Sequence, residues 1–153
     1  MKKFIKWLVV ILIFLQAAVL IAGVVIFRMP LPDHDIDVSG LPLTDFVEVI
    51  RDERGIPHIY GTNVDDILFA QGYVHAQDRF WQLEFWSHLS TGRLASLIGE
   101  PGVGADLLFR TFGFNRVALE EYETLPPEFK QDLINYTNGI NAYIESRPQR
   151  SLS

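Results

Sequence analysis

The sequence of 153 residues contains no cysteine. This excludes disulfides, thiol nucleophiles and thiolate metal sites. The chain also lacks a Gly-x-Ser-x-Gly elbow, a Ser-x-x-Lys motif and a glycine-rich phosphate loop. We therefore predict no catalytic, cofactor-binding or metal-binding residue within this chain.

Acidic residues are missing from the first 28 positions, and all 19 Asp and Glu follow Arg28. Nine of the 13 Lys and Arg residues also lie in that later part, so its net charge is about −10 (9 − 19). Such an acidic surface repels phosphates. We expect no nucleic-acid partner and no docking on an anionic membrane surface.

Residues 7–27 form a run without charge, broken only by Gln16. As a helix it would be about 31 Å long, which matches a bilayer core. Three lysines precede it within residues 1–6, and Arg28 follows it. This pattern predicts a transmembrane signal anchor with residues 1–6 in the cytoplasm and the remainder exported. A cleaved signal peptide is the competing interpretation, although the run exceeds a usual signal and lacks a polar cleavage region. A buried core helix is a third interpretation.

Residues 28–45 are expected to be an extended linker, because they hold three prolines and scattered aspartates. The ligand-like trio Asp33-His34-Asp35 falls in this linker. Nothing there would hold three side chains in a fixed geometry, so we expect it to be solvated and free of metal.

Two short apolar segments, 46–51 and 56–60, flank a turn at Gly55 and predict a β-hairpin. Pro57 cannot donate a hydrogen bond to a ladder and should sit at the start or edge of the second strand. Thr62 or Asn63 can cap the helix that follows.

The rest of the domain, 46–146, is predicted to be mostly helical, which gives an α+β class, and 147–153 is an unpatterned tail. Residues 67–86 are expected to form an aromatic-rich helix that is covered on most sides. The alternative is two helices, either broken near Gly72 or capped again at Asp78. A short helix is expected within 92–99, a loop at 101–104 and a helix over 109–122. The last helix starts at Pro126-Pro127-Glu128 and has one apolar face, formed by Phe129, Leu133, Tyr136, Ile140 and Tyr143.

The remaining polar candidates favour structural roles. His58 and His75 are expected to be hydrogen-bonded packing residues, and His88 should lie at a helix end. The paired acids are expected to be solvated rather than a glycosidase-like pair; they are Asp52-Glu53, Asp65-Asp66 and Glu120-Glu121.

Gln77-Asp78-Arg79 is the most polar point of the aromatic helix. Asp78 and Arg79 are adjacent and do not face each other on one helix, so each needs a partner elsewhere. We expect this cluster to tie the helix to the hairpin, for instance through Arg51 or Asp52.

Four segments together resemble the penicillin acylase (penicillin amidase) family of N-terminal-nucleophile hydrolases. The first two read Arg-Asp-x-x-Gly-x-Pro-His-Ile within residues 51–59 and Gly-Tyr-Val-x-Ala-Gln-Asp-Arg within 72–79. Gly92-Arg93-Leu94-Ala95 and Gly139-Ile140-Asn141-Ala142-Tyr143 extend the likeness over nearly all of the exported part. Ser96 departs from the pattern, which usually has Glu there.

The resemblance implies the N-terminal portion of an αββα fold and a precursor that cleaves itself into an α and a β chain. Its nucleophile would be a serine that begins the β chain, and neither Ser151 nor Ser153 fits that position. We expect the chain alone to be inactive, with the rest of the α chain and the β chain as its partners. Calcium is possible in the complete protein only.

The complete bacterial protein would then hydrolyse linear amides, such as β-lactam side chains or acyl-homoserine lactones. It would be held in the inner membrane by residues 7–27, with its domain in the periplasm or outside the cell. The alternative is a membrane-anchored, non-catalytic scaffold that binds a partner chain.

Overall fold

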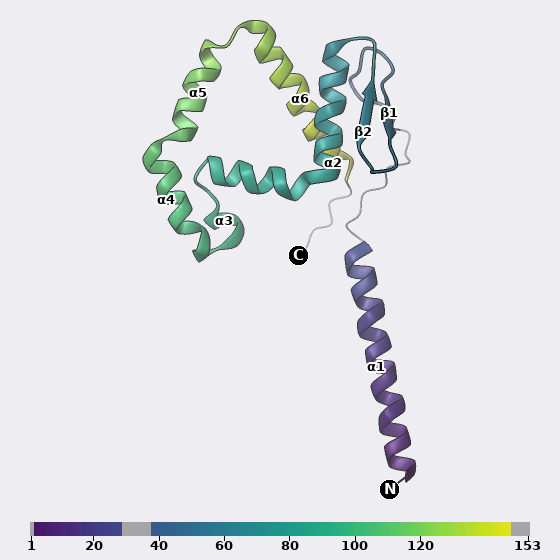
Figure 1. The fold of residues 1–153 in the computed structure, drawn as a ribbon. Coiled ribbons are helices and arrows are strands. Elements are labelled where there is room, and N and C mark those ends of the chain that lie inside the picture. Colours follow the sequence, from purple (N-terminus) through teal and green to yellow (C-terminus); the bar gives the residue numbers. More distant parts are fainter. Residues whose placement is uncertain (1, 29–37, 148–153) are drawn as a thin grey trace. The chain divides into compact units, whose positions relative to one another are not determined.

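The structure, a computed structural model, describes residues 2–28 and 38–147 (Figure 1). The chain divides into two compact units, Met1–Asp37 and Val38–Ser153. The first holds helix α1 (Lys2–Arg28). The second holds a hairpin and the remaining helices, with bounds β1 (Glu48–Arg51), β2 (Pro57–Tyr60), α2 (Val64–Ser90), α3 (Ala95–Ile98), the 3₁₀ turn η1 (Glu100–Gly102), α4 (Val103–Phe112), α5 (Phe114–Thr124) and α6 (Pro127–Ser146).

Helix α1 has 27 residues and includes the whole of the predicted anchor. Within the described residues, however, no helix combines the length and apolar character needed to cross a bilayer. The transmembrane assignment of residues 7–27 thus has no support from the structure and stays a prediction. Asp33-His34-Asp35 lies outside the described residues.

The predicted hairpin is confirmed. β1 and β2 pair antiparallel, with Val49 opposite Ile59 and Ile50 opposite His58. Gly55 adopts φ +77° in the turn, a conformation that favours glycine. Pro57 opens β2, where its missing N–H costs the ladder least.

Helix α2 begins after Asn63, whose side-chain oxygen accepts the N–H of Asp66 at 2.8 Å. Of the two predicted caps, Asn63 is the one used. The expected break near Gly72 is wrong, because the helix runs through that residue. It bends instead at Arg79 (φ −136°, ψ 30°), directly after Asp78, and the bend is visible in Figure 1.

The core lies where the first half of α2 meets α6. A Cβ on Gly72 would overlap the backbone oxygen of Tyr136, and one on Gly139 would overlap that of Phe69. The two glycines therefore let the helix backbones touch. Beside this crossing, the Tyr73 and Tyr143 rings meet edge to face, with 5.4 Å between their centroids.

The apolar face predicted for α6 is only partly buried. Tyr143 is buried and Ile140 packs against it, whereas Phe129 and Leu133 are exposed. Trp81 and Trp86 on the second half of α2 are also exposed, so the described residues do not supply the cover that the sequence predicts for this helix.

Between α2 and α6, the chain forms what we call the arm, residues 95–125. The loop predicted at 101–104 is wrong: Pro101 lies in η1, and Val103 already starts α4. The helix expected over 109–122 is two helices, α4 and α5, because Gly113 turns the chain at φ +71°. Figure 1 shows the arm leaving the bent end of α2 and returning through α6.

Candidate functional site

The hairpin and α2 are joined by one guanidinium. Arg51 Nη1 donates to Asp78 Oδ2 at 2.9 Å, and Nη2 donates to Asp78 Oδ1 at 2.8 Å and to Gln77 Oε1 at 2.9 Å. Nη1 also donates to the Gly55 carbonyl at 3.1 Å. A two-pronged contact of this kind is stronger and more directional than a single hydrogen bond. We call this group the Arg51 clamp.

The Arg51 clamp confirms the predicted tie between helix and hairpin, with Arg51 as the partner of Asp78. Asp52, the other candidate, instead serves the hairpin turn. Its Oδ1 accepts the N–H groups of Arg54 and Ile56, both at 2.9 Å. The Ile56 N–H is the main reason why the pKa of Asp52 is lowered, because it stabilises the charged form.

A second carboxylate, Asp66, fixes the chain that leads into the hairpin. The side chain is 4% exposed and accepts the N–H groups of Thr44 at 3.0 Å and Asp45 at 2.8 Å, as well as Asn63 Nδ2. The Asn63 amide, followed by the Thr44 N–H, lowers the pKa of Asp66. The expectation that Asp65-Asp66 is a solvated pair is wrong for Asp66, because its oxygens replace water with these donors.

A third carboxylate, Asp106, was missed from the sequence. It is buried and accepts the N–H groups of Leu94 at 2.6 Å and Ala95 at 2.9 Å, which start the short helix α3. One turn later, Arg110 Nε donates to the Gly92 carbonyl at 2.7 Å. Asp106 and Arg110 thus hold the Gly92-Arg93-Leu94-Ala95 segment at its two ends. The signal for this role was a single acid within the apolar start of α4.

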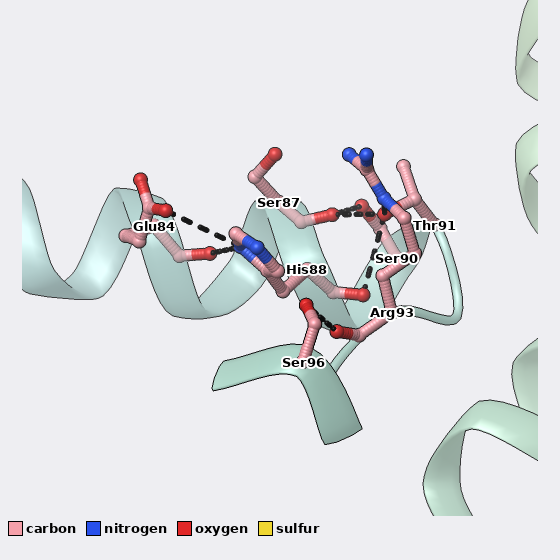
Figure 2. Close-up of polar contacts among 7 residues, drawn as sticks. All are labelled: Glu84, Ser87, His88, Ser90, Thr91, Arg93 and Ser96. Carbon is pink, nitrogen blue, oxygen red and sulfur yellow. Dashed lines mark hydrogen bonds and ion pairs between the residues drawn. The ribbon is translucent and has the colours of Figure 1, made fainter. Parts of the chain in front are cut away.

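His88 lies in the last turn of α2, as predicted (Figure 2). Its Nδ1 is 2.9 Å from the carbonyl oxygen of Glu84 and 3.5 Å from Glu84 Oε1. In the same turn, Thr91 Oγ1 donates to the Ser87 carbonyl at 2.7 Å. These contacts satisfy polar groups at the helix end.

Figure 2 also shows how the chain continues from α2 into α3. Arg93 Nε donates to Thr91 Oγ1 at 3.1 Å, and Ser96 Oγ donates to the Arg93 carbonyl at 2.7 Å. Ser96 stands where the resemblance leads us to expect Glu. A serine at this position uses its hydroxyl locally, within its own turn.

Two more histidines of the described residues, His75 and His58, also lie beside polar groups. His75 Nδ1 is 2.9 Å from the Tyr136 hydroxyl across the α2–α6 contact, and burial raises the pKa of Tyr136. His58 Nε2 is 3.6 Å from Asp52 Oδ2. Within residues 2–28 and 38–147, no group of three or more His, Asp or Glu side chains could hold a metal ion.

Chemically, the site is a set of positioning contacts. Among the residues whose burial is described, the buried polar side chains are Asp66, Gln77 and Asp106, and each is hydrogen-bonded. In the described part of the chain, no buried side-chain nitrogen or oxygen lacks a partner. A base or nucleophile needs an atom that faces substrate, whereas these atoms face the protein's own backbone and side chains.

The family model described as penicillin amidase matches residues 46–153. The chain belongs to the penicillin amidase family. Penicillin acylase 2 proenzyme of Pseudomonas sp. (strain SE83) is 40% identical over 100 residues, which are 65% of this chain and 13% of that protein. Acyl-homoserine lactone acylase QuiP of Pseudomonas putida is 36% identical over 102 residues, 67% of this chain and 12% of that protein.

A solved structure of the same family agrees with the fold. The match to the thermostable penicillin G acylase from Alcaligenes faecalis has a TM-score of 0.61 and 27% identity, and it covers 69% of this chain and 56% of that chain. The chain spans about an eighth of the length of the curated penicillin amidase relatives it matches. The Arg51 clamp joins the two segments on which the family resemblance first rested.

Proposed function

We propose that this chain is the N-terminal part of a penicillin-acylase-type amidohydrolase precursor. The observation that carries the proposal is the family match over 46–153, within which Arg51 of one signature segment binds Gln77 and Asp78 of the other. The part described would act as scaffold, because its buried polar groups are occupied in holding the hairpin, α2 and α3 together.

The reaction we propose for the complete protein is hydrolysis of a linear amide. The nucleophile would be a serine at the start of a β chain outside residues 1–153, with its own α-amine as base. An α-amine has a pKa near 8, so it can accept the hydroxyl proton near neutral pH. The penicillin acylase 2 relative from Pseudomonas sp. (strain SE83) is named a proenzyme, which supports a precursor. The names of the relatives favour a β-lactam side chain or an acyl-homoserine lactone as substrate.

The partners in this proposal are the remainder of the α chain and the β chain. Calcium, which the family resemblance allows, would belong to the complete protein in this proposal.

We also propose that residues 7–27 hold the domain at the bacterial inner membrane, with residues 1–6 in the cytoplasm. This rests on the uncharged run and its flanking lysines. Fusion of alkaline phosphatase, which is active only after export, directly after Arg28 tests the orientation. High activity in the membrane fraction is expected. Inactive fusions, together with an active cytoplasmic reporter at the same site, would overturn the proposal.

The decisive experiment for the enzymatic proposal compares two proteins. One is residues 1–153; the other is the product of the same gene including any coding sequence downstream. Both are assayed against chromogenic phenylacetyl and fatty-acyl amides. We expect turnover and a newly cleaved serine N-terminus only in the longer product. Turnover by residues 1–153 would contradict the missing nucleophile, and absence of a downstream serine-bearing domain would favour the non-catalytic scaffold.

A further inference from the structure

Helix α4 presents an uncharged face to solvent. Its large members are Val103, Leu107, Leu108 and Phe112, all exposed, with Leu107 at 64% and Phe112 at 63%. Gly104 and Thr111 lie between them on the same side of the helix. The opposite side carries the buried Asp106, so the helix already has an inner face. The exposed side is therefore a second apolar face.

Helix α5 continues this surface. None of its residues is buried. By helical spacing, Phe114, Ala118 and Tyr122 lie on one side, whereas Arg116 and Glu120 lie on the other and form an ion pair at 2.8 Å. An amphipathic helix of this kind normally buries its apolar side. We call the exposed apolar residues of α4 and α5 the arm face.

Apolar surface of this extent marks a contact with another surface. The acidic domain, with a net charge of about −10, is poorly suited to an anionic bilayer. The curated relatives carry about seven times more chain beyond the matched part, and 44% of the matched Alcaligenes chain lies outside the alignment. Chain length outside the described domain is thus available to cover the arm face.

We propose that the arm face is the docking surface for the part of the same precursor that follows residue 153. This inference rests on the proposed function and adds to it a specific contact surface. The arm is held in place by Asp106 and Arg110 before the continuation arrives. Its outer side remains free to bind.

The absence of cysteine provides a direct test. Leu107→Cys places a single thiol on the arm face of residues 1–153, and Glu120→Cys places one on the polar side of α5 as the matched control. Both variants are made in residues 1–153 and in the longer gene product. Maleimide modification at each position is followed by peptide mass spectrometry, so thiols elsewhere do not interfere.

We expect Leu107→Cys to react at least about tenfold more slowly in the longer product than in residues 1–153, which corresponds to about 1.4 kcal/mol. Glu120→Cys should change by less than about threefold. A second pair of changes, Leu107→Glu with Phe112→Glu, should raise the soluble monomeric fraction of residues 1–153 at unchanged helicity and block assembly of the longer product.

The outcomes separate this inference from the proposed function. A processed, amide-hydrolysing enzyme in which Leu107→Cys reacts as fast as in residues 1–153 overturns the docking surface and leaves the function standing. Protection of Leu107→Cys in an inactive product overturns the function and supports the docking surface. Protection that appears in residues 1–153 alone and grows with concentration assigns the face to a second copy and overturns the inference.

Discussion

The α2–α6 crossing and the arm are built on opposite principles. In the described part of the chain, every buried hydrophobic side chain except Leu94 lies on the first half of α2 or on α6. The arm, in contrast, is attached through Asp106 and Arg110 to the segment 92–95 that follows α2, and it leaves its apolar residues exposed. Among the described residues, the crossing is buried, whereas the outer side of the arm is exposed.

The two regions show separately how close helix packing and side-chain hydrogen bonds hold segments together. At the crossing, two glycines bring helix backbones together, so stability depends on shape and dispersion. In the arm, backbone N–H groups donate to one carboxylate. This attachment is directional, but it buries little apolar surface. Five substitutions, each with a control, test the contacts of the two regions and of the hairpin.

The largest effect is expected for Gly72→Ala. Its Cβ would overlap the Tyr136 carbonyl, so the two helices must separate, and we expect a loss of about 3 kcal/mol or more. Gly104→Ala in the arm is the matched control. Its Cβ meets nothing within 4 Å, so the helix preference of alanine should stabilise α4 by about 0.5–1 kcal/mol. Urea unfolding followed by circular dichroism measures the free energy of unfolding of both variants. Equal losses in the two variants would show that the α2–α6 crossing and the arm do not differ in how tightly they are packed.

Arg51→Ala should have the next largest effect. It removes the guanidinium that donates to Asp78 and Gln77, and we expect a loss of about 2 kcal/mol. Arg54→Ala, on the exposed hairpin turn, should stay within about 0.5 kcal/mol. The same urea titration applies. A difference of less than about 0.5 kcal/mol between the two variants would show that the Arg51 clamp contributes nothing.

Asp106→Asn should act locally. An amide has one acceptor oxygen for two backbone donors, so we expect a cost of about 1–2 kcal/mol at the start of α3. Hydrogen exchange at the amides of Leu94 and Ala95 should quicken about tenfold, while the amides of the α2–α6 crossing keep their rates. Glu121→Gln, exposed on α5, is the control. Uniform acceleration through the domain would mean that arm and crossing unfold together.

The smallest expected effect is on the dependence of stability on pH under acidic conditions. The pKa of Asp66 is lowered from 3.8, chiefly by the Asn63 amide. As pH falls, the unfolded chain therefore takes up a proton first, and the stability present above about pH 4 is lost as pH passes through the folded pKa. Asp66→Asn and Asn63→Ala should both flatten the dependence of the urea midpoint on pH below 4. Asn138→Ala, on the exposed side of α6, should keep the wild-type slope.

Much of the fold was predictable because its signals are local. Gly55 and Pro57 placed the hairpin, Asn63 the start of α2, and Pro126-Pro127 the start of α6. The Arg51–Asp78 contact was also predicted, since a charged pair amid apolar neighbours requires a partner. The predicted loop at 101–104 failed because Pro101 and Gly102 were interpreted as breakers, yet proline is tolerated in a first helical turn.

The roles of Asp66 and Asp106 could not be predicted in the same way. Each accepts backbone N–H groups of a segment distant in sequence. Because every residue except proline carries a backbone N–H, the residue types of that segment do not indicate that it is the donor. The packing role of Gly72 was missed for a similar reason. Its purpose depends on Tyr136, which the linear sequence does not connect to it.

The crossing of α2 and α6 also determines an order of events during synthesis. The Arg51 clamp joins positions 27 apart, whereas His75 and Tyr136, beside the glycine contact, are 61 apart. A ribosome releases the N-terminal segments first, so hairpin and α2 can combine while α6 is still being made. During that interval, the surface of α2 around Gly72 is not yet in contact with α6. We expect slow codons within 91–126 to prolong this exposure and to favour aggregation of the nascent chain.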